Sequence, residues 1–136
     1  MKLEEQVTSY GLSEALKKLG VPQESYFVWR HWRSNGALGV YKKQDKWFDY
    51  PRARGMKPQT TFNCSAFTTA ELGENKLYQD YECHTARVYI GADKRWLCVS
   101  NTLRNVAESR QYGATEAEAR GLMVAYLIRN HTVTAS

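Results

Sequence analysis

The chain has 136 residues, of which 43% are hydrophobic, and a formal net charge of +5. This length provides material for one core, so we expect a single domain over residues 1–136. No apolar run approaches the roughly 18 residues of a membrane-spanning helix, and the first residues lack the apolar stretch of a secretory signal. We therefore expect no membrane contact and a cytoplasmic location.

In its first half, the sequence predicts a helix followed by two strands. Ser9 can cap a helix with leucines at helical spacing, which ends at residues 20–22, Gly-Val-Pro. Residues 25–32 are rich in aromatic and β-branched side chains, as is typical of a strand. After a turn signal at 34–36, a second strand is expected over 38–43, with 47–50 continuing it.

The segment 51–61 holds two prolines, a glycine and three cations, and it has no apolar period. We expect a mobile basic loop there, since long loops in compact domains are often functional.

The second half predicts a short helix, a hairpin and a final helix. Thr68 and Glu71 fit a capping box that starts the short helix. Residues 85–90 and 95–100 alternate as strands, and the turn signal between them predicts a hairpin. Residues 101–113 are polar, and we expect them to be irregular. The final helix follows a second capping box, and its apolar stripe is Ala119, Leu122, Met123, Tyr126 and Leu127. The tail 132–136 is expected to fray.

The resulting order, α-β-β-α-β-β-α, predicts an α+β fold. The expected architecture is an antiparallel sheet of about four strands with helices on one face. If the aliphatic residues of the hairpin (Val88, Ile90, Leu97 and Val99) face the helices, its cationic and aromatic residues face outward. They would then form a stacking platform of Arg87, Tyr89 and Trp96. A register slip of one residue reverses these faces.

Positive charge is concentrated in one stretch. Residues 30–58 carry eight basic and two acidic side chains, a net charge of +6, whereas the remainder of the chain has a net charge of −1. Aromatic residues are interleaved with these cations. Guanidinium groups bind phosphates and aromatic rings stack on bases, so this composition favours an anionic, flat ligand such as a nucleotide. The candidate ligand-binding residues are Arg30, Trp32, Arg33, Trp47, Tyr50, Arg52, Arg54, Arg87, Tyr89 and Trp96.

No sequence motif indicates catalysis or metal binding. The nucleophile-elbow, zinc-protease, P-loop and dinucleotide-binding patterns are absent. Cys83 and His84 are adjacent on a predicted strand, so their side chains point to opposite faces. The odd cysteine count, with Cys64 and Cys98 far away, predicts free thiols rather than a disulfide framework or zinc site. We expect a protein that is not an enzyme and holds no cofactor.

Several segments together resemble a group of small, uncharacterised proteins from bacteriophages and integrated prophages. They are residues 3–7 (LEEQV), 16–25 (LKKLGVPQES), 66–74 (AFTTAELGE) and 114–120 (ATEAEAR), which cover about a third of the chain. The basic stretch is not part of this pattern. The group has no established activity, so the resemblance implies provenance alone: a phage accessory protein acting inside a bacterial host.

Three functions agree with these features. The first is an anti-defence protein that sequesters a small nucleotide-like signal through an Arg/aromatic pocket, as a homo-oligomer and without catalysis. The second is a nucleic-acid-binding protein of phage replication or regulation, whose affinity would fall steeply with salt. The third is a protein that inhibits a host defence factor, because Trp, Tyr and Arg are enriched at interface hot spots.

Overall fold

The computed structural model describes residues 2–43, 60–105, 107 and 109–131, and it has an α+β fold. Within these ranges, no helix has the length and hydropathy needed to cross a bilayer. The helices and strands are, in chain order, η1 (Leu3–Glu5, a 3-10 turn), α1 (Tyr10–Lys18), β1 (Phe27–Trp32), β2 (Leu38–Lys42), β3 (Thr60–Ala66), α2 (Thr69–Gly73), α3 (Lys76–Asp80), β4 (Cys83–Ile90), β5 (Asp93–Ser100), β6 (Arg110–Gly113) and α4 (Glu116–His131).

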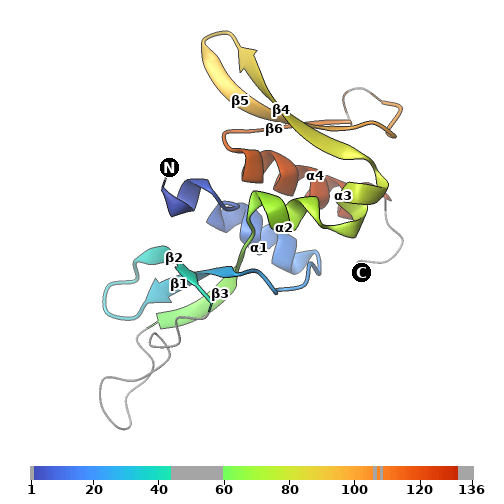
Figure 1. Cartoon of the computed structure of the whole chain (residues 1–136). Helices are drawn as coiled ribbons and strands as arrows, with labels where there is room; N and C mark the ends of the chain where they lie inside the picture. Colours follow the sequence, from blue (N-terminus) through green and yellow to red (C-terminus); the bar gives the residue numbers. More distant parts are fainter. Residues whose placement is uncertain (1, 44–59, 106, 108, 132–136) are drawn as a thin grey trace.

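The strands form two separate antiparallel sheets, so the prediction of one four-stranded sheet is wrong. One sheet has the order β2-β1-β3 and the other the order β4-β5-β6. Helices lie between them, because α1 packs against β3 and α4, while α4 packs against all three strands of the second sheet. Figure 1 shows the two sheets at opposite ends of the molecule.

The first sheet packs one face on α1. Trp29 on β1 lies opposite Val40 and Cys64 in the register, and its indole Nε1 donates to the Thr8 carbonyl at 3.1 Å. The Tyr10 ring meets Trp29 edge-on at 5.9 Å. The β1–β3 register shifts between Trp29 and Arg30, which pair with Cys64 and Phe62, so β3 has one extra residue at this bulge.

Helix α4 is central to the second half. It contacts the three other α-helices as well as the second sheet, so it is buried on more than the single stripe expected from the sequence. Ala119, Met123 and Leu127 of the stripe are fully buried, but so are Val124 and Ala125. A helix enclosed by helices on one side and a sheet on the other needs apolar residues around its circumference.

The second sheet presents to α4 the face opposite to the one we predicted. Cys98 and Ser100 of β5 are buried towards the helices, and Trp96 packs partly against the same core. Ile90, expected inside, is 50% exposed. Arg87 lies opposite Trp96 in the register, so both share the helix-facing side. On β5 the small side chains of Cys98 and Ser100, rather than the larger ones of Leu97 and Val99, are therefore the buried ones.

The caps at the helix starts follow the sequence closely. Ser9 accepts the Leu12 N–H, and Thr68 and Glu71 form a complete capping box. At α4, the Thr115 hydroxyl accepts the Glu118 N–H at 3.1 Å. The Glu118 carboxylate accepts the backbone N–H of Ser9, which joins the beginnings of α1 and α4.

Four elements were not anticipated: η1, β3, α3 and β6. Strand β3 begins at Thr60, so it overlaps the end of the loop expected over 51–61. The rest of that loop, the possible strand over 47–50 and the tail 132–136 lie outside the described residues. Strand β6 occupies part of the segment 101–113 that was expected to be irregular.

Candidate functional site

The ten candidate ligand-binding residues fall into separate places. Trp47, Tyr50, Arg52 and Arg54 lie outside the described residues. Arg30, Trp32 and Arg33 belong to the first sheet and its turn, whereas Arg87, Tyr89 and Trp96 belong to the hairpin of the second. Since helices lie between the two sheets, the described candidates do not form one pocket.

In the first sheet, the candidate side chains are engaged within the fold. Arg30 is only 6% exposed, and its Nη1 donates to the Thr60 hydroxyl at 3.3 Å. The Trp32 indole donates to the Tyr41 hydroxyl at 2.6 Å, and the two rings meet edge-on. These contacts favour a structural role for Arg30 and Trp32, while Arg33 remains exposed in the turn.

The second group lies beside a pocket of about 660 Å³, which is within the size range of small-molecule sites. The hairpin β4–β5 forms one wall, η1 forms a second, and the beginnings of α2 and α4 form the others. Its lining residues are Glu5, Gln6, Thr68, Thr69, Ala70, Arg87, Trp96, Ala114, Thr115, Glu116 and Ala117. Only Arg87 and Trp96 of these were candidates from the sequence.

Arg87 and Trp96 form a cation–π pair on the pocket wall. The guanidinium carbon of Arg87 lies 5.5 Å from the centroid of the Trp96 ring. The Arg87 side chain is exposed and Trp96 is half-buried, so the pair presents a charge and a flat apolar surface side by side. The next pair towards the hairpin tip repeats the chemistry, with Lys94 Nζ 6.0 Å from the Tyr89 ring.

The beginning of α4 lines the pocket. The first N–H groups of any α-helix lack partners within the helix, and a helix dipole favours negative charge at this end. In α4 these groups include the N–H of Glu116 and Ala117, both of which line the pocket. Thr115, Thr68 and Thr69 also line the pocket, and the hydroxyls of Thr68 and Thr115 cap α2 and α4.

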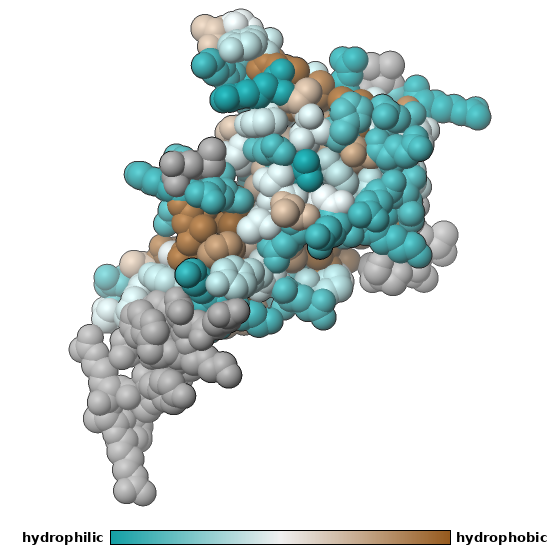
Figure 2. All heavy atoms as spheres, viewed as in Figure 1, coloured by the Kyte–Doolittle hydropathy of each residue, from teal (hydrophilic) through white to brown (hydrophobic). Residues whose placement is uncertain are grey.

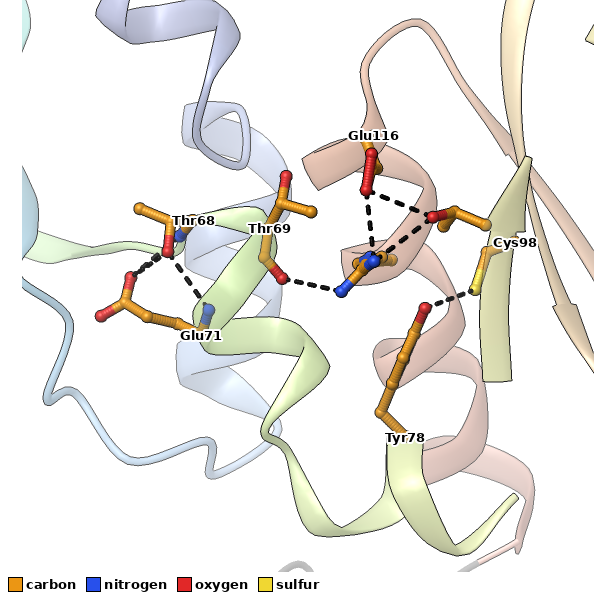
Figure 3. A network of polar contacts seen from close by, with 8 residues as sticks. Thr68, Thr69, Glu71, Tyr78, Cys98 and Glu116 are labelled. Atoms are coloured by element: carbon orange, nitrogen blue, oxygen red, sulfur yellow. Dashed lines mark hydrogen bonds and ion pairs between the residues drawn. The ribbon is translucent and has the colours of Figure 1, made fainter. Parts of the chain in front are cut away.

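Arg120 connects two walls of the pocket, and the sequence did not indicate it as a site residue. Its Nη1 donates to the Thr69 carbonyl at 3.1 Å, and its Nη2 pairs with the Glu116 carboxylate at 3.2 Å. Nη2 also contacts the Thr85 hydroxyl, which in turn donates to Glu116 (Figure 3). The guanidinium lies 5.2 Å from the Tyr78 ring. Arg120 therefore links α2, α3, β4 and α4, and it neutralises one of the two carboxylates that line the pocket.

Cys83 and Cys98 lie next to the hydrogen-bond network of Arg120, on the side of Tyr78. The Cys98 thiol contacts the Tyr78 hydroxyl at 3.8 Å (Figure 3). A hydrogen bond between the two thiols raises the pKa of Cys98 and lowers that of Cys83, because it favours the thiolate at Cys83. All three cysteines are free, as predicted.

His31 and His84 are not among the residues that line the pocket. His31 contacts the Asn63 amide and meets the Tyr10 ring edge-on, and His84 is exposed on β4. Across the described ranges, His, Cys, Asp and Glu side chains nowhere gather in a group of three or more that could hold a metal ion.

Comparisons with known proteins found no similar protein. No family model matches the chain, and no curated protein or solved structure matches it either.

Proposed function

We propose that this protein binds a small anionic, nucleotide-like ligand in the pocket beside the β4–β5 hairpin, without chemical conversion. The Arg87–Trp96 pair carries this proposal. Trp96 offers a surface for a base, and the adjacent guanidinium offers two parallel donors to a phosphate. The N–H groups at the beginning of α4 would add to the binding of that phosphate.

The charge of the pocket limits the number of phosphates. Arg87 is the single cationic side chain among the described lining residues, and Glu116 is already paired with Arg120. Glu5 and the three threonines suit the hydroxyl and amino groups of a nucleoside. A ligand with one phosphate fits this balance better than a polyphosphate. It also fits better than a nucleic-acid strand, whose binding requires several cations along a groove.

The biological role rests on the resemblance to phage proteins. A small phage protein acting in the bacterial cytoplasm would sequester a nucleotide signal of host defence by binding it tightly and stoichiometrically. Such a role requires affinity and no turnover. Inhibition of a host protein and binding of nucleic acid remain the alternatives.

Isothermal titration calorimetry tests the proposal with adenosine and guanosine monophosphates as probes, and with adenosine and inorganic phosphate alone for comparison. We expect one site per chain for a monophosphate and weaker binding of either fragment. Trp96→Ala and Arg87→Ala should each weaken binding about tenfold or more, because base stacking contributes about 1–3 kcal/mol. The matched control is Arg33→Ala, which removes an exposed arginine from the other sheet and should leave affinity unchanged.

Two results would overturn the proposal. One is the absence of binding by every mononucleotide at millimolar concentration. The other is conversion of the probe to a product, detected by chromatography of the mixture after titration. Binding of a single-stranded oligonucleotide with a steep salt dependence would instead support the nucleic-acid alternative.

A further inference from the structure

The second sheet has an apolar face that the described helices do not cover. Helices α3 and α4, which contact this sheet, pack on the side of Cys98 and Ser100. The opposite side carries alternate residues of each strand: Ala86, Val88, Ile90, Leu97, Val99 and Tyr112. Ile90 is 50% exposed and Tyr112 is 41% exposed. Figure 2 shows hydrophobic atoms along the β4–β5 hairpin. We call these six residues the outer face.

This composition is unusual for a sheet face in water. Antiparallel sheets that face solvent normally alternate between an apolar buried side and a polar exposed side. Here the side towards α4 has Thr85, Cys98 and Ser100 beside Trp96. The opposite side has the aliphatic residues, of which Ala86 and Ile90 are exposed and Val88, Leu97 and Val99 are half-buried. Exposed apolar patches of this kind mark interaction surfaces.

Charges at the two ends of the outer face differ in sign. Asp93 lies at the hairpin tip, opposite Ile90 in the register. At the other end, His84, Val99 and Arg110 lie side by side on three strands. Arg95 lies next to Asp93 on this side of β5, opposite Val88. On this side of the sheet, the acidic group Asp93 therefore lies at the hairpin tip, and the basic groups Arg95, His84 and Arg110 lie along the rest.

We propose that the outer face binds the outer face of a second copy of this chain, forming a two-fold sandwich of two three-stranded sheets. A two-fold interface requires one patch to complement itself, and an aliphatic sheet face does so by packing at about 10 Å from its copy. The charges select the orientation. With strands of the two copies antiparallel, Asp93 of each copy faces the end with His84 and Arg110 of the other. With parallel strands, Asp93 would meet its own counterpart.

The size of the outer face indicates a weak dimer. Strands β4 and β5 have eight residues each, which corresponds to a length of about 27 Å, and three strands are about 14 Å wide. This footprint is smaller than the about 800 Å² per partner of a standard stable interface. We therefore expect a dimer that dissociates in the micromolar range. The outer face lies on the opposite side of the sheet from the pocket, so this inference does not rest on the proposed ligand.

Sedimentation velocity over about 1–500 µM protein tests the dimer directly, since this range spans a micromolar dissociation constant. The full chain should change from 15.7 kDa towards twice that mass as concentration rises. Leu97→Asp should keep it monomeric throughout. Tyr89→Asp, a change on the same hairpin but on its other side, should leave the dimer unchanged.

Charge reversal at exposed positions tests the orientation without disturbing the core. Asp93→Arg and Arg110→Asp should each weaken the dimer several-fold, and the double variant should restore it. A monomer at every concentration would overturn the proposal. So would a dimer that Leu97→Asp leaves intact, or single reversals whose effects simply add in the double variant. Sedimentation of the wild type as a monomer that gains mass only with acidic lipid vesicles or a host protein would assign the face to another partner.

Discussion

Arg120 joins two walls of the pocket without lining the pocket itself. Its guanidinium bonds to the Thr69 carbonyl and the Glu116 carboxylate, which belong to two different walls of the pocket. Gly73 lies directly against this guanidinium, and a side chain there would occupy its place. Arg120 is thus a positioning residue, held between helices that are distant in sequence.

Replacing Arg120 with methionine should lower stability and weaken ligand binding together. Methionine keeps much of the volume but removes the charge-assisted hydrogen bonds to the half-buried Glu116 and Thr69, and a hydrogen bond to a charged group contributes about 1.5–3 kcal/mol. Urea unfolding and calorimetry measure the two effects. Arg129→Met removes an exposed arginine from the same helix and is the control. Equal stability of the two variants would contradict this role.

Phenol and thiol groups with raised pKa values make the stability of the fold depend on pH in the alkaline range. Burial raises the pKa of Cys64 from 9.0 to about 11, and the hydrogen bond to Glu14 raises the pKa of Tyr10 from 10.0 to about 12. Burial also raises the pKa of Tyr78. In each case the folded state holds the proton more tightly, so unfolding releases protons as the pH rises above the ordinary value.

The melting temperature should therefore be constant with respect to these groups below pH 9. It should then fall between pH 9 and 12, the window set by Cys64 and Tyr10. Thermal unfolding followed by circular dichroism at intervals across this range measures the fall. Tyr10→Phe lowers the whole curve because the bond to Glu14 is lost, but its decline above pH 10 should be shallower. A stability that rises with pH in this window would contradict the assignment.

At the scale of elements, α4 is the helix against which the other α-helices and the second sheet pack. The turn from β6 into α4 brings Gly113 against the helix backbone, so that a Cβ there would lie 2.5 Å from the Ala119 nitrogen. Gly113→Ala should destabilise the protein by about 1–3 kcal/mol, the usual cost of overpacking. Gly11 in α1 faces open space, so Gly11→Ala should stabilise by about 0.5–1 kcal/mol. Chemical denaturation of both variants checks the opposite signs, and a shared sign would refute the packing at Gly113.

The sequence predicted elements whose signals are local. Ser9, Thr68 and Thr115 mark helix starts with side chains that bond within a few residues, and all three are confirmed. Helix α3 has a similar local signal, which the sequence analysis did not use. The Asn75 side chain caps this helix by accepting the N–H groups of Leu77 and Tyr78. Strands β3 and β6 have no such signal. The first is polar and bulged, the second has only four residues, and each forms by pairing with a distant strand.

The candidate site could be predicted only in part, for the same reason. Trp96 and Arg87 were identified by residue type, but their side of the sheet was predicted incorrectly. That choice depends on whether Cys98 or Leu97 faces α4, and alternation alone fits both. Thr69, Thr115 and Glu116 reach the pocket through the packing of α2 beside α4, which no local pattern encodes.

At the scale of the whole molecule, helices lie between two small sheets. The described candidate residues, which the sequence analysis grouped by their cationic and aromatic composition, therefore lie in two separate places. The first sheet holds Arg30 and Trp32 within its own contacts, and the second presents Arg87 and Trp96 to a pocket. The two sides of the second sheet differ in chemistry: Cys98, Ser100 and Trp96 lie on the side towards α4, and the aliphatic residues of the outer face lie on the other. We infer that it binds a ligand with one side and a second copy with the other.

A ¹H–¹⁵N correlation spectrum of the labelled protein, titrated with adenosine monophosphate at physiological salt, tests the ligand site most directly. We expect the Trp96 indole N–H and the backbone N–H signals of residues 68–70 and 114–117 to shift together and saturate. The Trp32 indole signal, which belongs to the other sheet, should stay in place. Shifts confined to the first sheet, or no saturating shift with any mononucleotide, would contradict binding at the Arg87–Trp96 pocket.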